Sequence, residues 1–155
     1  MSIFYTFTDG SSLGNTPDSP AGSAAYFPVL HRAITYGTIG TSNYVEIFAI
    51  RMALWYIKNV LLNDEFTRKF SKIVIYSDSE YAIGVVDGKN KAKQHQELVN
   101  VCKAYAIAIR KEIVMEILHV KAHTGKKDFI FKGNDIADKE AKNAAEKKKK
   151  SMEMH

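Results

Sequence analysis

Four acidic residues of this chain stand where a folded protein could bring them together: Asp9, Glu46, Asp78 and Asp138. Asp9 and Asp78 each end a short apolar stretch and have small residues as their next neighbours. Two carboxylates held close together repel each other, and each raises the pKa of the other unless a cation lies between them. Mg²⁺ prefers carboxylate oxygens together with water and phosphate oxygens. These residue types therefore predict a magnesium site, provided that the fold gathers the four acids.

The strands that would position the first acids are predicted from the pattern of apolar residues. Residues 3–8, 22–30 and 33–41 are predicted as three strands, and their short connections favour an antiparallel meander. Residues 72–79 are mostly apolar, as is typical of a buried parallel strand, and 112–120 are predicted as the fifth strand. Right-handed crossovers place the fourth strand beside the first and parallel to it.

Apolar residues at helical spacing predict the helices that lie between and after these strands. The first helix runs from a cap at Ser42 or Asn43 to Leu61. Three more helices are predicted over residues 79–88, 95–111 and 134–150. The predicted fold class is therefore α/β, with a mixed five-stranded sheet of three antiparallel and then two parallel strands and with helices on both faces. Trp55 and Cys102 are expected in the core, and Cys102 is not expected to be a nucleophile.

The predicted sheet brings the first three acids to one edge. The C-terminal ends of parallel neighbouring strands meet at the same edge of a sheet, so Asp9 and Asp78 should lie close together. Glu46 precedes Ile50 by four residues and Ala53 by seven, which places it on the side of its helix that faces the sheet. The alternatives are that Asp9 only caps a turn and that Glu46 lies on a solvent-exposed helix face.

The last helix carries the fourth acid. Its spacing to Ala141 and Ala145 places Asp138 on a face of small residues, which can approach the sheet closely. The alternative is an ion pair between Asp138 and Lys142, four residues further along the helix. Asp135 is expected in the first turn, where the helix dipole favours a carboxylate.

Charge is unevenly distributed along this chain of 155 residues, whose length fits one domain. Residues 1–87 hold 6 Lys and Arg against 8 Asp and Glu, whereas residues 88–155 hold 16 against 9. A basic half favours a polyanionic partner such as nucleic acid, with a solubilising surface as the alternative.

The single cysteine excludes a disulfide within the chain, and no apolar run is long enough to span a membrane. We expect an intracellular, cytoplasmic protein, with a nuclear location also open.

Five short motifs resemble, in order, the signature blocks of the type 1 ribonuclease H family. They are TDGSSLGN (8–15), SNYVEIFAI (42–50), IYSDSEYAI (75–83), VKAHTG (120–125) and NDIADKEA (134–141). The resemblance implies a ribonuclease H-like fold. It also implies that Asp9, Glu46, Asp78 and Asp138 are metal-binding catalytic residues and that His123 is a catalytic loop histidine. The other histidines, His31, His95, His119 and His155, are expected at the surface or, for His119, in a structural role.

The resemblance implies a reaction, cofactors and a partner. The reaction would be hydrolysis of the RNA strand of RNA–DNA hybrids, with two Mg²⁺ ions (Mn²⁺ as a substitute), leaving 5′-phosphate and 3′-hydroxyl ends. The partner would be the hybrid duplex, bound by a monomer that needs no membrane and no other protein. The implied substrate contacts are Gly10, Ser11, Asn15, Ser42, Asn43, Ser79 and Glu80. A free-standing enzyme is expected, because Met1 lies next to the first strand.

Some residues depart from the family pattern. Ser42 and Glu80 stand where asparagine and glutamine are expected, and the basic connector DGKNKAKQHQ (87–96) contains no tryptophan. The loop after His123 is long and carries lysines. We hypothesise that this loop and a basic, flexible tail (146–155) replace the substrate contacts that these departures weaken. The catalytic domain is then expected over residues 1–145.

Three alternative functions stay open at this point. One is a nuclease of the same superfold that acts on DNA, because a fold does not determine a function. Another is a non-catalytic module that binds hybrids, although four acids near phosphate would weaken such binding. The third is the nuclease domain of a longer reverse transcriptase.

Overall fold

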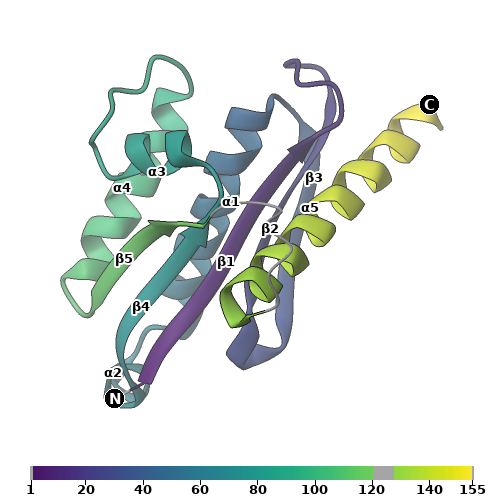
Figure 1. Cartoon of the computed structure of the whole chain (residues 1–155). Coiled ribbons are helices and arrows are strands. Elements are labelled where there is room, and N and C mark those ends of the chain that lie inside the picture. Colours follow the sequence, from purple (N-terminus) through teal and green to yellow (C-terminus); the bar gives the residue numbers. More distant parts are fainter. Residues whose placement is uncertain (1, 121–127, 155) are drawn as a thin grey trace.

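The computed structural model describes residues 2–120 and 128–154. Its centre is a five-stranded sheet with the strand order β3-β2-β1-β4-β5 (Figure 1). The strands are β1 (Ser2–Ser12), β2 (Pro20–Phe27), β3 (Arg32–Ile39), β4 (Phe70–Ser77) and β5 (Val114–His119). The first three pair antiparallel, and β4 and β5 continue the sheet parallel to β1. The predicted mixed sheet is confirmed, including the parallel pairing of the first and fourth strands.

Helices cover both faces of this sheet, as predicted. They are η1 (Pro28–Leu30), α1 (Ser42–Tyr56), the π-helical turn η2 (Ile57–Leu61), α2 (Asp64–Lys69), α3 (Glu80–Val86), α4 (Gln96–Arg110) and α5 (Phe129–Glu153). Helices α1, α3 and α4 lie on one face, and α5 crosses the other face over β1, β2 and β3 (Figure 1). In the described part of the chain, no helix is both long and apolar enough to cross a membrane.

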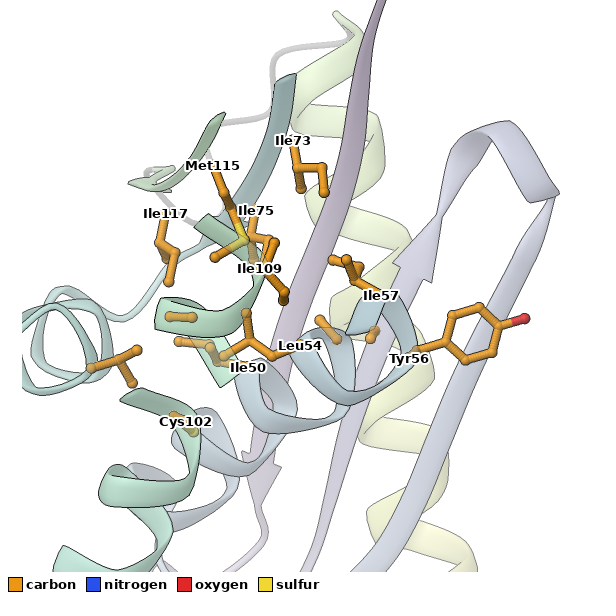
Figure 2. Packing of buried hydrophobic residues seen from close by; sticks show 14 of the residues in the cluster. Ile50, Leu54, Tyr56, Ile57, Ile73, Ile75, Cys102, Ile109, Met115 and Ile117 are labelled. Carbon is orange, nitrogen blue, oxygen red and sulfur yellow. The ribbon is translucent and has the colours of Figure 1, made fainter. Parts of the chain in front are cut away.

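Large apolar side chains fill the space between the sheet and α1 with α4 (Figure 2). Ile50 and Leu54 of α1 meet Ile109 of α4 and Ile75 of β4 in this cluster, and all four are fully buried. Cys102 belongs to the same cluster, and burial raises the pKa of its thiol to about 12. A thiol with so high a pKa is a poor nucleophile at neutral pH, so the core assignment of Cys102 is confirmed.

Helix α5 packs against the opposite face through very small residues. A Cβ atom on Gly22 would lie 2.5 Å from the backbone oxygen of Ala141 and 2.6 Å from the Cβ of Ala144. The helix axis therefore lies closer to β2 than any larger residue at this position would allow. This close approach fixes the position of Asp138, which α5 carries one turn before Lys142.

Two strand boundaries differ from the predictions. β1 does not end at Asp9 but continues to Ser12, because Asp9 to Ser12 still pair with β2. β2 ends at Phe27 rather than at residue 30, because Pro28 begins a 3-10 turn that closes at His31 with a left-handed backbone, φ 49°.

The helix boundaries differ as well. Thr41, not Ser42 or Asn43, caps α1, since its side chain accepts a hydrogen bond from the Tyr44 N–H. α5 begins at Phe129 instead of residue 134, which moves Asp135 out of the first turn. It continues to Glu153, through most of the segment 146–155 that was predicted as a flexible tail. The short helix α2 was not predicted at all.

Trp55 was assigned to the wrong environment. It lies on α1, but its side chain is 43% exposed rather than part of the core. Its neighbour Leu54 faces the sheet and is fully buried.

Candidate active site

The ends of the paired region of β1 and β4 bring two acids to one edge of the sheet. The parallel ladder ends with Thr8 opposite Ser77, so the next residue on each strand is an aspartate, Asp9 or Asp78. β4 stops there, whereas β1 continues and pairs only with β2. The prediction that the two carboxylates lie close together is supported by this register.

The backbone of Gly10 connects the third acid to the first. Its N–H donates to Oδ1 of Asp9 at 2.9 Å and to Oε1 of Glu46 at 2.7 Å. A Cβ atom on Gly10 would lie 2.5 Å from the carbonyl carbon of Val45, so only glycine lets α1 come this close to β1. Gly10 was predicted as a substrate contact, and the structure gives it a second role in holding Glu46.

Asp9, Glu46 and Asp78 form a cluster in which one ligand oxygen from each lies within 4.8 Å of the others. Asp9 is only 2% exposed, and the other two are half-buried. Within the described residues, Oδ2 of Asp9 and Oδ1 of Asp78 are buried and accept no hydrogen bond. Buried polar atoms without a partner are rare in proteins, because they lose hydration without compensation. Three hard oxygen donors with two unsatisfied buried oxygens fit a divalent cation such as Mg²⁺.

Burial changes the acidity of this cluster strongly. The pKa of Asp9 is raised to about 9, first by burial and then by the charge of Asp78 and by contact with Asp138. The pKa of Glu46 is raised well above its ordinary value, first by burial and then by the charges of Asp9 and Asp78. Without a cation, burial therefore favours protons on Asp9 and Glu46. A divalent cation would displace them and hold the acids in the charged form.

Asp138 lies beside this cluster and not within the group of three. Its proximity to Asp9 contributes to the raised pKa of Asp9. Oδ2 of Asp138 also accepts from Nζ of Lys142 at 3.0 Å, and this contact raises the pKa of Lys142. Both interpretations of Asp138 are therefore realised: it reaches the other acids, and it forms the i,i+4 ion pair.

The predicted substrate contacts lie around the same edge, and several of them also have structural partners. Ser79 caps α3, because its Oγ accepts from the Ala82 N–H at 3.0 Å. Oδ1 of Asn15 accepts from the Ser42 N–H at 2.9 Å, which ties the loop after β1 to the start of α1.

The remaining predicted contacts are accessible. Glu80 is exposed and lies 3.6 Å from Nδ1 of His119, which is itself exposed at the end of β5. Asn43 is exposed on the first turn of α1, and Ser11 is half-buried near the end of β1. His123, the predicted catalytic histidine, and the lysines at 126 and 127 lie outside the described residues, so their roles stay predictions.

A groove of about 530 Å³ beside the start of α1 was not predicted from the sequence. It is lined by Pro17, Ile39, Gly40, Thr41, Tyr44, Gln94 and His95. His95 was expected at the surface, but its Nε2 is buried without a hydrogen-bond partner among the described residues, and its ring packs edge-on against Tyr44 at 5.1 Å. Its position just before a strongly periodic helix was the only signal in the sequence.

Comparisons with known proteins agree with this fold. The N-terminal RNase H domain of Rv2228c from Mycobacterium tuberculosis is 16% identical, with a TM-score of 0.71 over 98% of this chain and 99% of that chain. RNase H1 from the archaeon Halobacterium salinarum is 18% identical, with a TM-score of 0.59 over 94% and 99% of the two chains. LC11-RNase H1, isolated from compost by a metagenomic approach, is 20% identical, with a TM-score of 0.66 over 95% and 98%. No match was found among curated proteins.

The strand order and the helices on both faces of the sheet define a ribonuclease H-like fold. The RNase H family profile matches residues 2–146, and the chain therefore belongs to the RNase H family. Membership of this family implies a nuclease, a hydrolase that binds nucleic acid.

Proposed function

We propose that this protein hydrolyses the RNA strand of RNA–DNA hybrids with divalent metal ions held by Asp9, Glu46, Asp78 and Asp138. The observation that carries the proposal is the convergence of three carboxylates, two of whose buried oxygens have no hydrogen-bond partner among residues 2–120 and 128–154. Membership of the RNase H family supports the choice of substrate.

The donor set suits Mg²⁺, with Mn²⁺ as a substitute, because all of its atoms are carboxylate oxygens. When bound, two such ions supply activation of water and stabilisation of charge at the leaving 3′-oxygen, so that the products carry 5′-phosphate and 3′-hydroxyl ends. No side-chain nucleophile is required, which agrees with the burial of Cys102.

The residues of the chain position the acids for this chemistry. The Gly10 N–H orients the carboxylates of Asp9 and Glu46 toward each other. Lys142 balances the charge of Asp138 at 3.0 Å, so that this acid can stand beside the others at a lower electrostatic cost. The raised pKa values of Asp9 and Glu46 make metal binding pH-dependent, since protons must leave first.

Selection of RNA would depend on small polar groups around the acids. Ser11, Ser42 and Asn43 lie half-buried or exposed close to the elements that carry Asp9 and Glu46. Contacts of such groups with 2′-hydroxyls across a wide minor groove distinguish an RNA strand from a DNA strand.

The decisive test is a cleavage assay on a labelled hybrid with Mg²⁺, in which the wild type is compared with Asp9→Asn. We expect the variant to lose cleavage and to retain hybrid binding. The substitution removes a metal ligand but keeps the size and shape of the side chain. Duplex DNA and duplex RNA of the same sequence serve as controls, and the wild type should leave both intact. Preferential cleavage of duplex DNA would favour a DNA nuclease of the same superfold, and equal rates for the wild type and the variant would remove Asp9 from the metal site.

A further inference from the structure

Helix α5 carries seven of the sixteen lysines and arginines of residues 88–155. Its lysines are Lys132, Lys139, Lys142, Lys147, Lys148, Lys149 and Lys150. Its buried face consists of Gly133, Asn134, Ala137, Ala141, Ala144 and Ala145. The lysines lie outside this buried face, and Lys148 is the one from position 147 onward that is half-buried, with its Cβ close to Gly37 of β3.

The spacing of these lysines places two of them on the same side of α5 as Asp138. With 3.6 residues per turn, Lys149 follows Asp138 by three turns and about 20°, and Lys142 follows it by one turn and about 40°. Lys147 is rotated by about 180° from Asp138 and faces the opposite side. At about 1.5 Å per residue, Lys142 lies about 6 Å and Lys149 about 16 Å beyond Asp138 along the helix.

This side of α5 lies next to the acidic edge of the sheet. α5 passes over β1 and β2 and ends beyond β3, whereas the loop between α3 and α4 rises on the other side of the same edge (Figure 1). That loop carries Lys89, Lys91 and Lys93, which are all exposed. A duplex on the acidic edge would therefore have basic groups on both sides.

We propose that Lys142 and Lys149 form a phosphate-binding stripe that contacts the backbone of the hybrid on the α5 side of the acidic cluster; this inference rests on the proposed function. The lysine ammonium has three donors, so Lys142 can donate to a phosphate and still keep its contact with Asp138. Lys149 is exposed and would contact a phosphate further from the scissile bond. Charge complementarity with a polyanion is the interaction that such a stripe provides.

The distance from Asp138 to Lys149 along α5 sets the length of duplex that the stripe can contact. A reach of about 16 Å along the helix corresponds to roughly five base pairs, at about 3.4 Å per step. Extending a hybrid on one side of the cleavage site from two to six base pairs should therefore strengthen binding, and Lys149 should account for the gain.

The test measures hybrid affinity as a function of salt in the Asp9→Asn background, which prevents cleavage. The stripe variants are Lys149→Gln and Lys142→Gln/Lys149→Gln. The matched control is Lys147→Gln/Lys150→Gln, which removes the same charge from the same helix but from the sides that face away from Asp138. Lys149→Gln alone is the critical variant, because its position is three helical turns from Asp138.

We expect the slope of log Kd against log salt concentration to fall by about 1 for each stripe lysine and to stay unchanged in the control. The gain from extending the hybrid should also disappear in Lys149→Gln and persist in the control. Equal losses in the stripe and control variants, or an unchanged length dependence in Lys149→Gln, would overturn the stripe. Failure of the wild type to cleave any hybrid would overturn the proposed function instead, which is a separate result.

Discussion

The two faces of the sheet are packed in different ways. Against α1 and α4, large side chains such as Ile50, Leu54 and Ile75 fill a thick apolar layer. Against α5, Gly22 faces Ala141 and almost no side chain separates the helix from the strand. The first arrangement buries much apolar surface and stabilises the fold. The second contributes less apolar volume and fixes the position of a helix that carries an acid of the site.

The largest expected effect is on the α1 face. Leu54→Ala should lower the free energy of unfolding by about 2–5 kcal/mol, because it removes buried methyl groups and leaves a cavity. Chemical denaturation would measure this loss, and hybrid cleavage per folded molecule should stay close to that of the wild type. A loss of cleavage beyond the loss of folded protein would mean that this face also positions the acids.

A smaller loss of stability is expected on the α5 face, together with a larger effect on the site. Gly22→Ala places a Cβ 2.5 Å from the Ala141 oxygen, so α5 must move away, at a cost of about 1–3 kcal/mol. The displacement carries Asp138 with it, so we expect cleavage to fall further than stability does. Wild-type kcat in a destabilised Gly22→Ala protein would show that the close packing does not serve the site.

The cluster between the two faces should respond to pH. The pKa of Asp9 is about 9 in the folded protein and near 3.8 in the unfolded chain, so between these values the folded state holds a proton that the unfolded state has released. In metal-free buffer, the stability of the wild type should therefore fall as pH rises from about 4 to about 9. Asp9→Asn removes the titrating group, and it should be more stable than the wild type at pH 8 by at least about 1 kcal/mol, which corresponds to about 2–4 °C in Tm.

Thermal unfolding at several pH values, with and without Mg²⁺, checks this expectation. The ion should raise the Tm of the wild type more at pH 8 than at pH 6, because fewer protons then compete for the same oxygens. A wild-type Tm that does not change with pH in the absence of metal would contradict the burial of a titrating Asp9.

The smallest effect is expected at the ion pair between exposed Lys142 and half-buried Asp138. Lys142→Met removes the contact with Asp138, and pairs of this kind contribute only about 0.3–0.5 kcal/mol in a helix. Denaturation curves should therefore be nearly unchanged, whereas the Mg²⁺ concentration needed for half-maximal cleavage should change, because Asp138 loses its neighbouring cation. Lys147→Met on the opposite side of α5 is the matched control and should change neither quantity.

The sequence alone was sufficient to predict how three of the acids gather at one edge of the sheet. Alternating residues in β1 and the apolar run of β4 were sufficient to place Asp9 and Asp78 on neighbouring strands, and helical spacing was sufficient to turn Glu46 toward them. These patterns are local, and each depends only on which face of an element is buried.

The predictions were wrong where contacts between distant segments determine where a helix begins or how a side chain is buried. α5 begins at Phe129 because that ring packs against Tyr5 and Phe7 of β1, a contact that no local pattern contains. Asp128 caps the helix through its side chain, which was a signal present in the sequence and not used. His95 was misjudged for the same reason, since its ring packs against Tyr44 of α1. His123 lies outside the described residues, so its predicted role is untested.

The Gly10 amide affects which substitutions the acidic cluster can tolerate. One backbone N–H donates to two carboxylates on different elements, so the peptide itself acts as a fixed spacer between them. Lengthening either acid by one methylene, as in Asp9→Glu, would preserve the charge and lose this spacing. Substitutions elsewhere on the surface leave the spacer intact, and the centre can then keep its dimensions while the rest of the sequence diverges.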